Sequence, residues 1–178
     1  MTAPITWAKP ELGELNDFVG RAIDPSNYPQ EQFELFSVPI FPTKIPERVQ
    51  GSEIGSTKQI VEAKDILICK INPRINRVWL VPAKNSYRQI ASSEWIGFRS
   101  QIVEPRFATY YFRSPKFREL LCADVTGVGG SLTRAQPKRV ATFELPLAPL
   151  PEQKRIADKL DATLARVDAC RERLMRVR

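Results

Sequence analysis

Three ionisable residues, Glu47, Glu62 and Lys64, could together form a metal-dependent nuclease site. Paired carboxylates beside a lysine can hold a divalent metal, which activates a water and stabilises the leaving oxygen in phosphodiester hydrolysis. The match in this sequence is loose, and patterns this short arise readily by chance. We therefore keep a metal-dependent nuclease as an alternative hypothesis.

Other kinds of catalytic chemistry lack their residues. The chain has no histidine, which excludes Ser-His and Cys-His nucleophile activation within this chain. The glycine loop at 127–130 does not end in the Gly-Lys-Ser/Thr of a phosphate-binding loop. Asn72-Pro73-Arg74 lacks the second proline and the aromatic residue of an amino-methyltransferase motif. We expect a chain that is not an enzyme and that needs no cofactor and no metal.

The positive charge of the chain is concentrated in two segments. The net charge is +7 and the isoelectric point is about 9.5. Segment 42–88 has nine basic and four acidic residues, and segment 113–139 has six and two, whereas segment 1–41 has two and six. Such an uneven distribution is typical of a protein with an anionic partner. We expect the two basic segments to form one face.

The apolar patterns predict a mixed α+β domain with hairpins and short helices. Residues 33–38, 65–71 and 77–81 have the length and composition of strands, and the last two form a hairpin with a longer loop. Residues 107–123 change to helical spacing, with a second helix start at Ser114-Pro115. We therefore expect two short helices after the strands.

The end of the sequence predicts a long coiled-coil helix. Residues 151–178 contain no proline after Pro151 and no glycine, and their apolar residues follow a 4-3 alternation. This seam comprises Ile156, Leu160, Thr163, Val167, Cys170, Leu174 and Val177. Prolines before the helix favour an arm that projects from the domain, and the alternative is a helix folded back on it. We divide the chain into a globular domain, 1–150, and a helical spacer, 151–178.

The cysteines and the apolar runs indicate a cytoplasmic location. Cys69, Cys122 and Cys170 are odd in number and far apart, which is typical of reduced thiols and not of a disulfide framework. No run of eighteen apolar residues occurs, and the first residues do not have the pattern of a secretory signal. We expect no association with a membrane.

Four blocks of the sequence, taken in order, resemble a known family. They are 65–77, 114–118, 127–131 and 145–156, and the last, Leu-Pro-Leu-Ala-Pro-Leu-Pro-Glu-Gln-Lys-Arg-Ile, is the most specific. From about Trp7 onward the chain resembles the specificity subunits of type I restriction–modification systems. The resemblance implies a target-recognition domain that lays loops in the major groove of double-stranded DNA. It also implies a helix that pairs in antiparallel orientation with a counterpart and fixes the distance between two half-sites.

The resemblance also implies partners. In this family methylation and cleavage belong to separate subunits, so we expect a methyltransferase partner and, through it, a restriction subunit. The family subunit has two recognition domains and two helical regions, whereas each block occurs once here, which indicates a half-subunit. We expect a homodimer in which Ile156, Leu160, Val167 and Leu174 pair the helices. The alternative is a coiled-coil adaptor without DNA binding.

The residues that we expect at the DNA are basic or hydroxyl side chains in the two basic segments. Lysines and arginines would position phosphates, and a few loop side chains would read bases. The candidates are Lys58, Lys70, Arg74, Arg77, Arg88, Ser131, Thr133, Arg134 and Lys138. Arg74 and Arg134 lie in turn-forming segments and are the preferred candidates, whereas Lys70 and Arg77 could be surface charges beside a strand.

Overall fold

The chain folds into two β-sheets, a layer of short helices and one long helix. This computed structural model describes residues 7–84, 86–123 and 133–176. The strands are β1 (Ala22–Ile23), β2 (Gln32–Phe36), β3 (Glu47–Gln50), β4 (Lys58–Ile60), β5 (Ile66–Cys69), β6 (Val78–Leu80), β7 (Arg88–Ala91) and β8 (Trp95–Phe98). The α-helices are α1 (Leu12–Leu15), α2 (Pro105–Arg113), α3 (Pro115–Ala123), α4 (Pro137–Val140) and α5 (Leu150–Arg176). Short 3₁₀ turns are η1 (Pro25–Asn27), η2 (Phe41–Thr43), η3 (Gly51–Glu53) and η4 (Pro73–Ile75).

The two sheets differ in their topology. The larger has the strand order β1-β4-β7-β2-β3, and its central pair, β7 and β2, is parallel while the other pairs are antiparallel. The smaller sheet, β6-β5-β8, is antiparallel throughout. The apolar run Ile-Leu-Ile-Cys of β5 is buried on both faces, as a central strand covered on both sides requires. The predicted hairpin is confirmed by the pairing of β5 with β6, and the α+β fold class is confirmed as well.

Helices α2 and α3 form as their sequence predicts. Helix α2 packs on the smaller sheet, and α3 packs on α2 and on the turn η4. Glu104 caps α2 by accepting a hydrogen bond from the backbone N–H of Phe107, and Pro105 occupies the first turn. The hydroxyl of Ser114 accepts from the N–H of Phe117 at the start of α3. Phe112 and Phe117 are fully buried and pack on each other in the main hydrophobic core. These helices therefore hold the end of the smaller sheet that carries the loop between β5 and β6.

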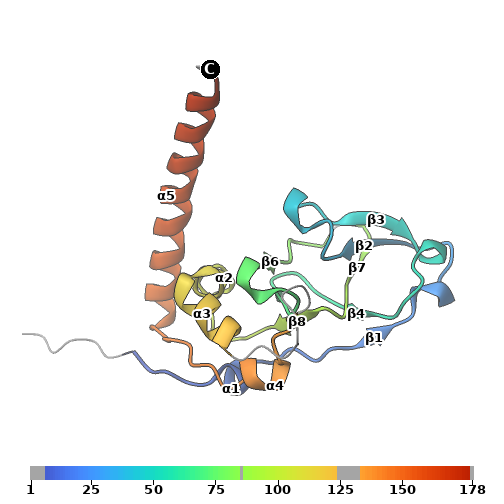
Figure 1. Ribbon diagram of the computed structural model, residues 1–178, viewed down its shortest axis with the longest axis horizontal. Coiled ribbons are helices and arrows are strands. Elements are labelled where there is room, and N and C mark those ends of the chain that lie inside the picture. Colours follow the sequence, from blue (N-terminus) through green and yellow to red (C-terminus); the bar gives the residue numbers. More distant parts are fainter. Residues whose placement is uncertain (1–6, 85, 124–132, 177–178) are drawn as a thin grey trace, which may run out of the picture.

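The long helix α5 belongs to the core at its base and leaves it further along. Gln153 and Ala157 are fully buried, and Ala157 is part of the main core. Every residue from 162 to 176 is exposed. Figure 1 shows α5 beside α2 and α3 at its base, with the remainder standing out from the globular part. The structure thus contains the projecting arm that the sequence predicts.

The apolar seam of α5 is covered by the domain at its start and exposed further along. Ile156, the first residue of the seam, packs against the main core of its own domain. Leu160 is half-buried, whereas Val167 and Leu174 are exposed. The physical reason is that the first turns of α5 lie on α2. The free seam therefore begins after Leu160, and Val177 lies outside the described residues. The division of the chain at residue 150 stays a prediction.

Candidate nucleic-acid interface

Two loops that are distant in sequence pair through their backbones. The N–H of Ala135 donates to the carbonyl of Lys70 at 2.9 Å, and the N–H of Asn72 donates to the carbonyl of Thr133 at 2.9 Å. These bonds form an antiparallel bridge between Ile71 and Arg134. We call segments 70–77 and 133–139 the paired loops. They bring six predicted residues together, namely Lys70, Arg74, Arg77, Thr133, Arg134 and Lys138.

Arg74 stands on a turn with a defined backbone. Asn72 and Asn76 flank η4 in the left-handed conformation, with φ of 48° and 49°, which asparagine adopts more readily than most residues. The side-chain amide of Asn76 donates to the carbonyl of Phe112 at the end of α2, at 2.9 Å. The turn is therefore fixed to the helical layer, and Arg74 is exposed at its tip.

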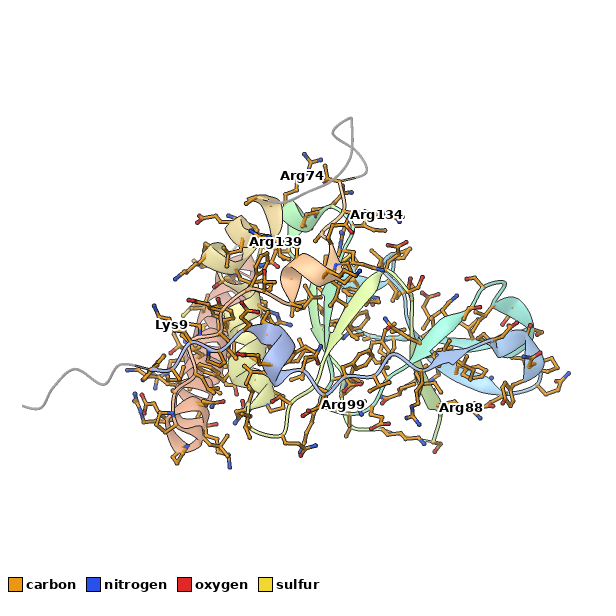
Figure 2. All side chains as sticks on the ribbon, turned by 90° about the horizontal axis from the view of Figure 1, so that it is seen from below. Lys9, Arg74, Arg88, Arg99, Arg134 and Arg139 are labelled. Carbon is orange, nitrogen blue, oxygen red and sulfur yellow. The ribbon has the colours of Figure 1, made fainter. Side chains whose placement is uncertain are left out.

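Arg134 is exposed and ion-paired. One of its guanidinium nitrogens lies 3.1 Å from Oε1 of Glu94, and 52% of its side chain is accessible. The carbonyl of Glu94 accepts a hydrogen bond from the N–H of Lys70 at 2.9 Å. The turn before β8 thus joins the paired loops as a third segment. Figure 2 shows Arg74 and Arg134 on the same side of the molecule.

Two of the predicted lysine and arginine residues are less exposed. Lys70 and Arg77 are half-buried, and Arg77 donates to the carbonyl of Ile71 at 3.3 Å. Arg77 therefore helps to close the turn that presents Arg74. This bond gives Arg77 a structural task in addition to the predicted contact with DNA.

Lys58 is connected to the paired loops by a shallow groove. Its ammonium group donates to the carbonyl and the hydroxyl of Ser56 at 2.8 and 2.5 Å. Partial burial lowers the pKa of Lys58. The groove, of about 550 Å³, is lined by Lys58, Ile71 and Glu94 among others. The groove therefore lies between residues of the larger sheet and the paired loops.

Arg88 is not brought to this surface. Arg88 lies on β7, pairs with Glu31 at 3.0 Å and stacks over Tyr28, with 4.7 Å to the ring centroid. Figure 2 shows Arg88 well away from Arg74 and Arg134. Ser131, like the glycine loop, lies outside the described residues. The predicted basic face is thus assembled from parts of the two segments and does not include Arg88.

The two glutamates of the nuclease alternative do not meet. Glu47 lies on β3 and accepts a hydrogen bond from Ser37, whereas Glu62 follows β4 and pairs with Arg21 at 2.7 Å. Strands β7 and β2 lie between β4 and β3. In the described ranges no three acidic, cysteine or histidine residues come close enough to hold a metal ion. Nothing in this geometry favours the nuclease hypothesis.

Three features of this surface are not indicated by the sequence pattern. Glu94 is acidic and so was not sought in a basic face, although it holds Arg134. Asn76 repeats the polar turn residue Asn72 four positions later, a signal that could have been used. A cavity of about 410 Å³ also gathers Lys9, Lys116 and Arg139 above the apolar side chains of Leu120 and Phe143. Its basic residues come from three separate segments, which no local pattern predicts.

No helix in the described part of the chain is long and apolar enough to cross a membrane. Fold and site together define an α+β domain with a basic surface of paired loops and a projecting helical arm. The model of the type I restriction modification DNA specificity domain family matches residues 4–175. The chain therefore belongs to this family, and the resemblance noted in the sequence is confirmed.

Solved structures agree with this assignment. The chain is similar to the HsdS subunit from Thermoanaerobacter tengcongensis, with a TM-score of 0.81 and 25% identity over 97% of this chain and 45% of that one. It has the same fold as a chain from a structure of type I R-M system complex assembly and conformational transition, with a TM-score of 0.80 and 24% identity. Of that chain, too, it covers 45%. The chain thus spans less than half the length of these proteins. Comparison with curated protein sequences gives no match.

Proposed function

We propose that this chain recognises a DNA sequence through the paired loops and acts as a specificity module of a type I restriction–modification system. The observation that carries the proposal is the convergence of Lys70, Arg74, Arg134 and Lys138 on two hydrogen-bonded loops. Cationic side chains on a fixed backbone suit phosphate positioning and reading of base edges in the major groove. Membership of the DNA specificity family supports the same function.

The module contributes recognition, and partner subunits contribute the chemistry. The chain has no histidine, and Glu47 and Glu62 lie on opposite sides of two strands. A methyltransferase subunit and, through it, a restriction subunit would act at the site that this module selects. An adaptor without DNA binding is disfavoured by the cationic paired loops. The module would act in the cytoplasm, where its DNA and its partner subunits are found.

The arm α5 is proposed to pair with another helix. Val167 and Leu174 are exposed on its projecting part, with 40% and 70% of their surface accessible. An apolar strip of this kind is stabilised by burial against a second helix. A second copy of the chain, in antiparallel orientation, would supply it and place two domains at opposite ends with two-fold symmetry. Such a dimer would read an inverted repeat with a fixed gap.

The test is selection of DNA by the purified chain with and without a methyltransferase subunit. Duplexes with a randomised central region are incubated with protein, and the retained molecules are sequenced. We expect a defined motif, and with the methyltransferase subunit present we expect methylation at that motif. Retention of unrelated sequences at equal frequency in both arms would overturn the proposal. Binding of S-adenosylmethionine by the chain alone, measured by calorimetry, would contradict the division of labour.

A further inference from the structure

Glu94 places a carboxylate within a surface that is otherwise basic. It belongs to the turn between β7 and β8, and its carbonyl accepts from the N–H of Lys70 on the paired loops. A negative charge beside a phosphate backbone weakens binding, because it opposes the cations that neutralise the phosphates. Affinity for DNA therefore gives no reason for an acid at this position, and another role has to account for it.

The two carboxylate oxygens of Glu94 differ in their contacts. Oε1 lies 3.1 Å from the guanidinium of Arg134. Oε2 is buried and has no hydrogen-bond partner. A buried acceptor without a donor is costly, so such atoms are rare in folded proteins. Because the protein encloses this oxygen, a donor from outside the chain does not reach it, and the carboxylate contacts the surface through Oε1 and Arg134.

The guanidinium of Arg134 contacts Glu94 through one nitrogen and remains partly accessible. About half of its side chain is accessible, and its backbone is fixed by the bridge to Ile71. An arginine that reads guanine presents two nitrogens to O6 and N7 of the base, and the contact is strongest when the side chain is already oriented. The carboxylate of Glu94 supplies this orientation.

The shallow groove gives Glu94 access to the edge of the surface. Glu94 lines it together with Ser92, Ile71 and Lys58. A quarter of the Glu94 side chain is accessible. The groove therefore places this carboxylate beside the surface on which Arg134 stands.

We propose that Glu94 is a specificity-determining residue, which orients Arg134 towards a guanine through the ion pair at Oε1. The inference rests on the proposed function of the paired loops. It predicts that Glu94 lowers the affinity for DNA in general and raises the preference for one sequence. These two effects have opposite signs and can be measured separately.

The experiment compares Glu94→Gln with the wild-type chain on three duplexes. They are the selected motif, the same motif with its guanine–cytosine pair replaced, and an unrelated sequence. Glutamine keeps the size of the side chain and leaves the backbone bond to Lys70 intact, so the paired loops remain. We expect equal or tighter binding to the unrelated duplex and a loss of roughly tenfold or more in the ratio of the first two affinities.

Two further variants separate orientation from charge. Arg134→Lys keeps the positive charge but loses the planar fork, and we expect it to reduce the ratio while leaving the salt dependence unchanged. Glu152→Gln removes a carboxylate that pairs with Arg155 at 2.7 Å on α5, and we expect it to change neither quantity. Thermal unfolding of all variants checks that they are folded.

The outcomes are distinct. If Glu94→Gln changes the affinity for all three duplexes by the same factor, Glu94 is only a surface charge and the inference is overturned while the proposed function stands. If the wild-type chain itself has no preference among the duplexes, the proposed function fails and the inference fails with it. A loss of preference in Glu94→Gln and Arg134→Lys, but not in Glu152→Gln, supports the inference.

Discussion

Arg74 and Arg134 come from distant parts of the sequence and stand on one pair of loops. We predict that Arg74→Ala and Arg134→Ala each weaken binding to the selected motif by about 1–3 kcal/mol, the range for an arginine that reads guanine. Fluorescence anisotropy at fixed salt measures the change. Arg88→Ala is the comparison, and an equal loss there would extend the interface to β7. Unchanged binding in the double variant, with the methyltransferase subunit present, would remove the paired loops from the interface.

Asp65 and Arg99 form an ion pair in which one partner is fully buried. The guanidinium of Arg99 contacts the Asp65 carboxylate at 2.6 and 2.8 Å, and this contact raises the pKa of Arg99. Asp65 has no accessible surface, whereas 28% of the Arg99 side chain is accessible. Removing the arginine leaves a buried charge without its partner, while removing the acid leaves an arginine that can turn to water.

We therefore predict an asymmetry in stability. Arg99→Ala should lower the free energy of unfolding by about 3–5 kcal/mol, and Asp65→Asn should lower it by less. Urea unfolding of both variants measures the difference. Equal losses would mean that burial of the carboxylate does not dominate this contact.

The sequence indicates some of these residues and conceals others. Arg74 and Arg134 follow turn signals, so local chemistry points to them. Glu94 is acidic, so a pattern of basic residues does not indicate it, and its role depends on Arg134, which is far away in sequence. The contact between Asp65 and Arg99 joins two strand ends of the smaller sheet. Pairs of this kind follow from the fold and not from any local pattern.

Helix α5 is attached to the domain through Gln153. Its amide oxygen accepts from the N–H of Glu104 at 2.8 Å, and its amide nitrogen donates to the carbonyl of Ala148 at 2.8 Å. We predict that Gln153→Leu, which leaves both groups without partners, lowers the free energy of unfolding by about 1–3 kcal/mol. Hydrogen exchange should increase at the start of α5. Lys159→Ala, at an exposed position of the same helix, is the control and should change neither quantity.

A second attachment involves Tyr110, whose hydroxyl donates to the carboxylate of Asp161. Burial and this hydrogen bond raise the pKa of Tyr110 to about 12. Because the folded pKa lies above the unfolded value of about 10, the stabilising effect is complete below pH 10 and disappears as the pH rises towards 12. We predict that Tyr110→Phe removes this part of the alkaline loss of stability. Unfolding curves of both proteins across that interval measure it, and identical pH profiles would contradict the prediction.

At the level of elements, long and strongly patterned segments were predictable. The hairpin of β5 and β6, the pair α2 and α3, and the projecting arm follow from apolar spacing and helix-start signals. Strand β3, which has four residues and follows a proline-rich segment, gave no usable pattern. The burial of the first turns of α5 was not predictable, because the buried residues are Gln153, which is polar, and Ala157, which is small. Tertiary contacts bury them, and no seam of large apolar residues marks them.

The whole molecule carries a net charge of +7. If each of the six basic residues Lys58, Lys70, Arg74, Arg77, Arg134 and Lys138 neutralises one phosphate, log K should fall with log salt with a slope of roughly −5. Titrations at several salt concentrations give this slope. Lys138→Ala should reduce it by about one and weaken the binding of all sequences alike. A slope near zero would contradict binding through these cations.

Self-association is the second property of the whole molecule. We predict that the chain forms dimers at micromolar concentration and that Val167→Asp/Leu174→Asp makes it monomeric. Both residues lie beyond the part of α5 that packs on the domain, so the fold should remain intact. Arg166→Asp, at an exposed position outside the seam, is the control. Sedimentation measures the mass, and a wild type and a double variant that both remain monomeric would show that this helix does not pair with itself.

Two bonds between backbone atoms join the paired loops, from Ala135 to Lys70 and from Asn72 to Thr133. Such bonds do not depend on which side chains the residues carry. Exchanging the side chains at positions 70, 74 and 134 should therefore leave the surface intact while changing what it reads. A library varied at these three positions should therefore yield folded proteins with new targets.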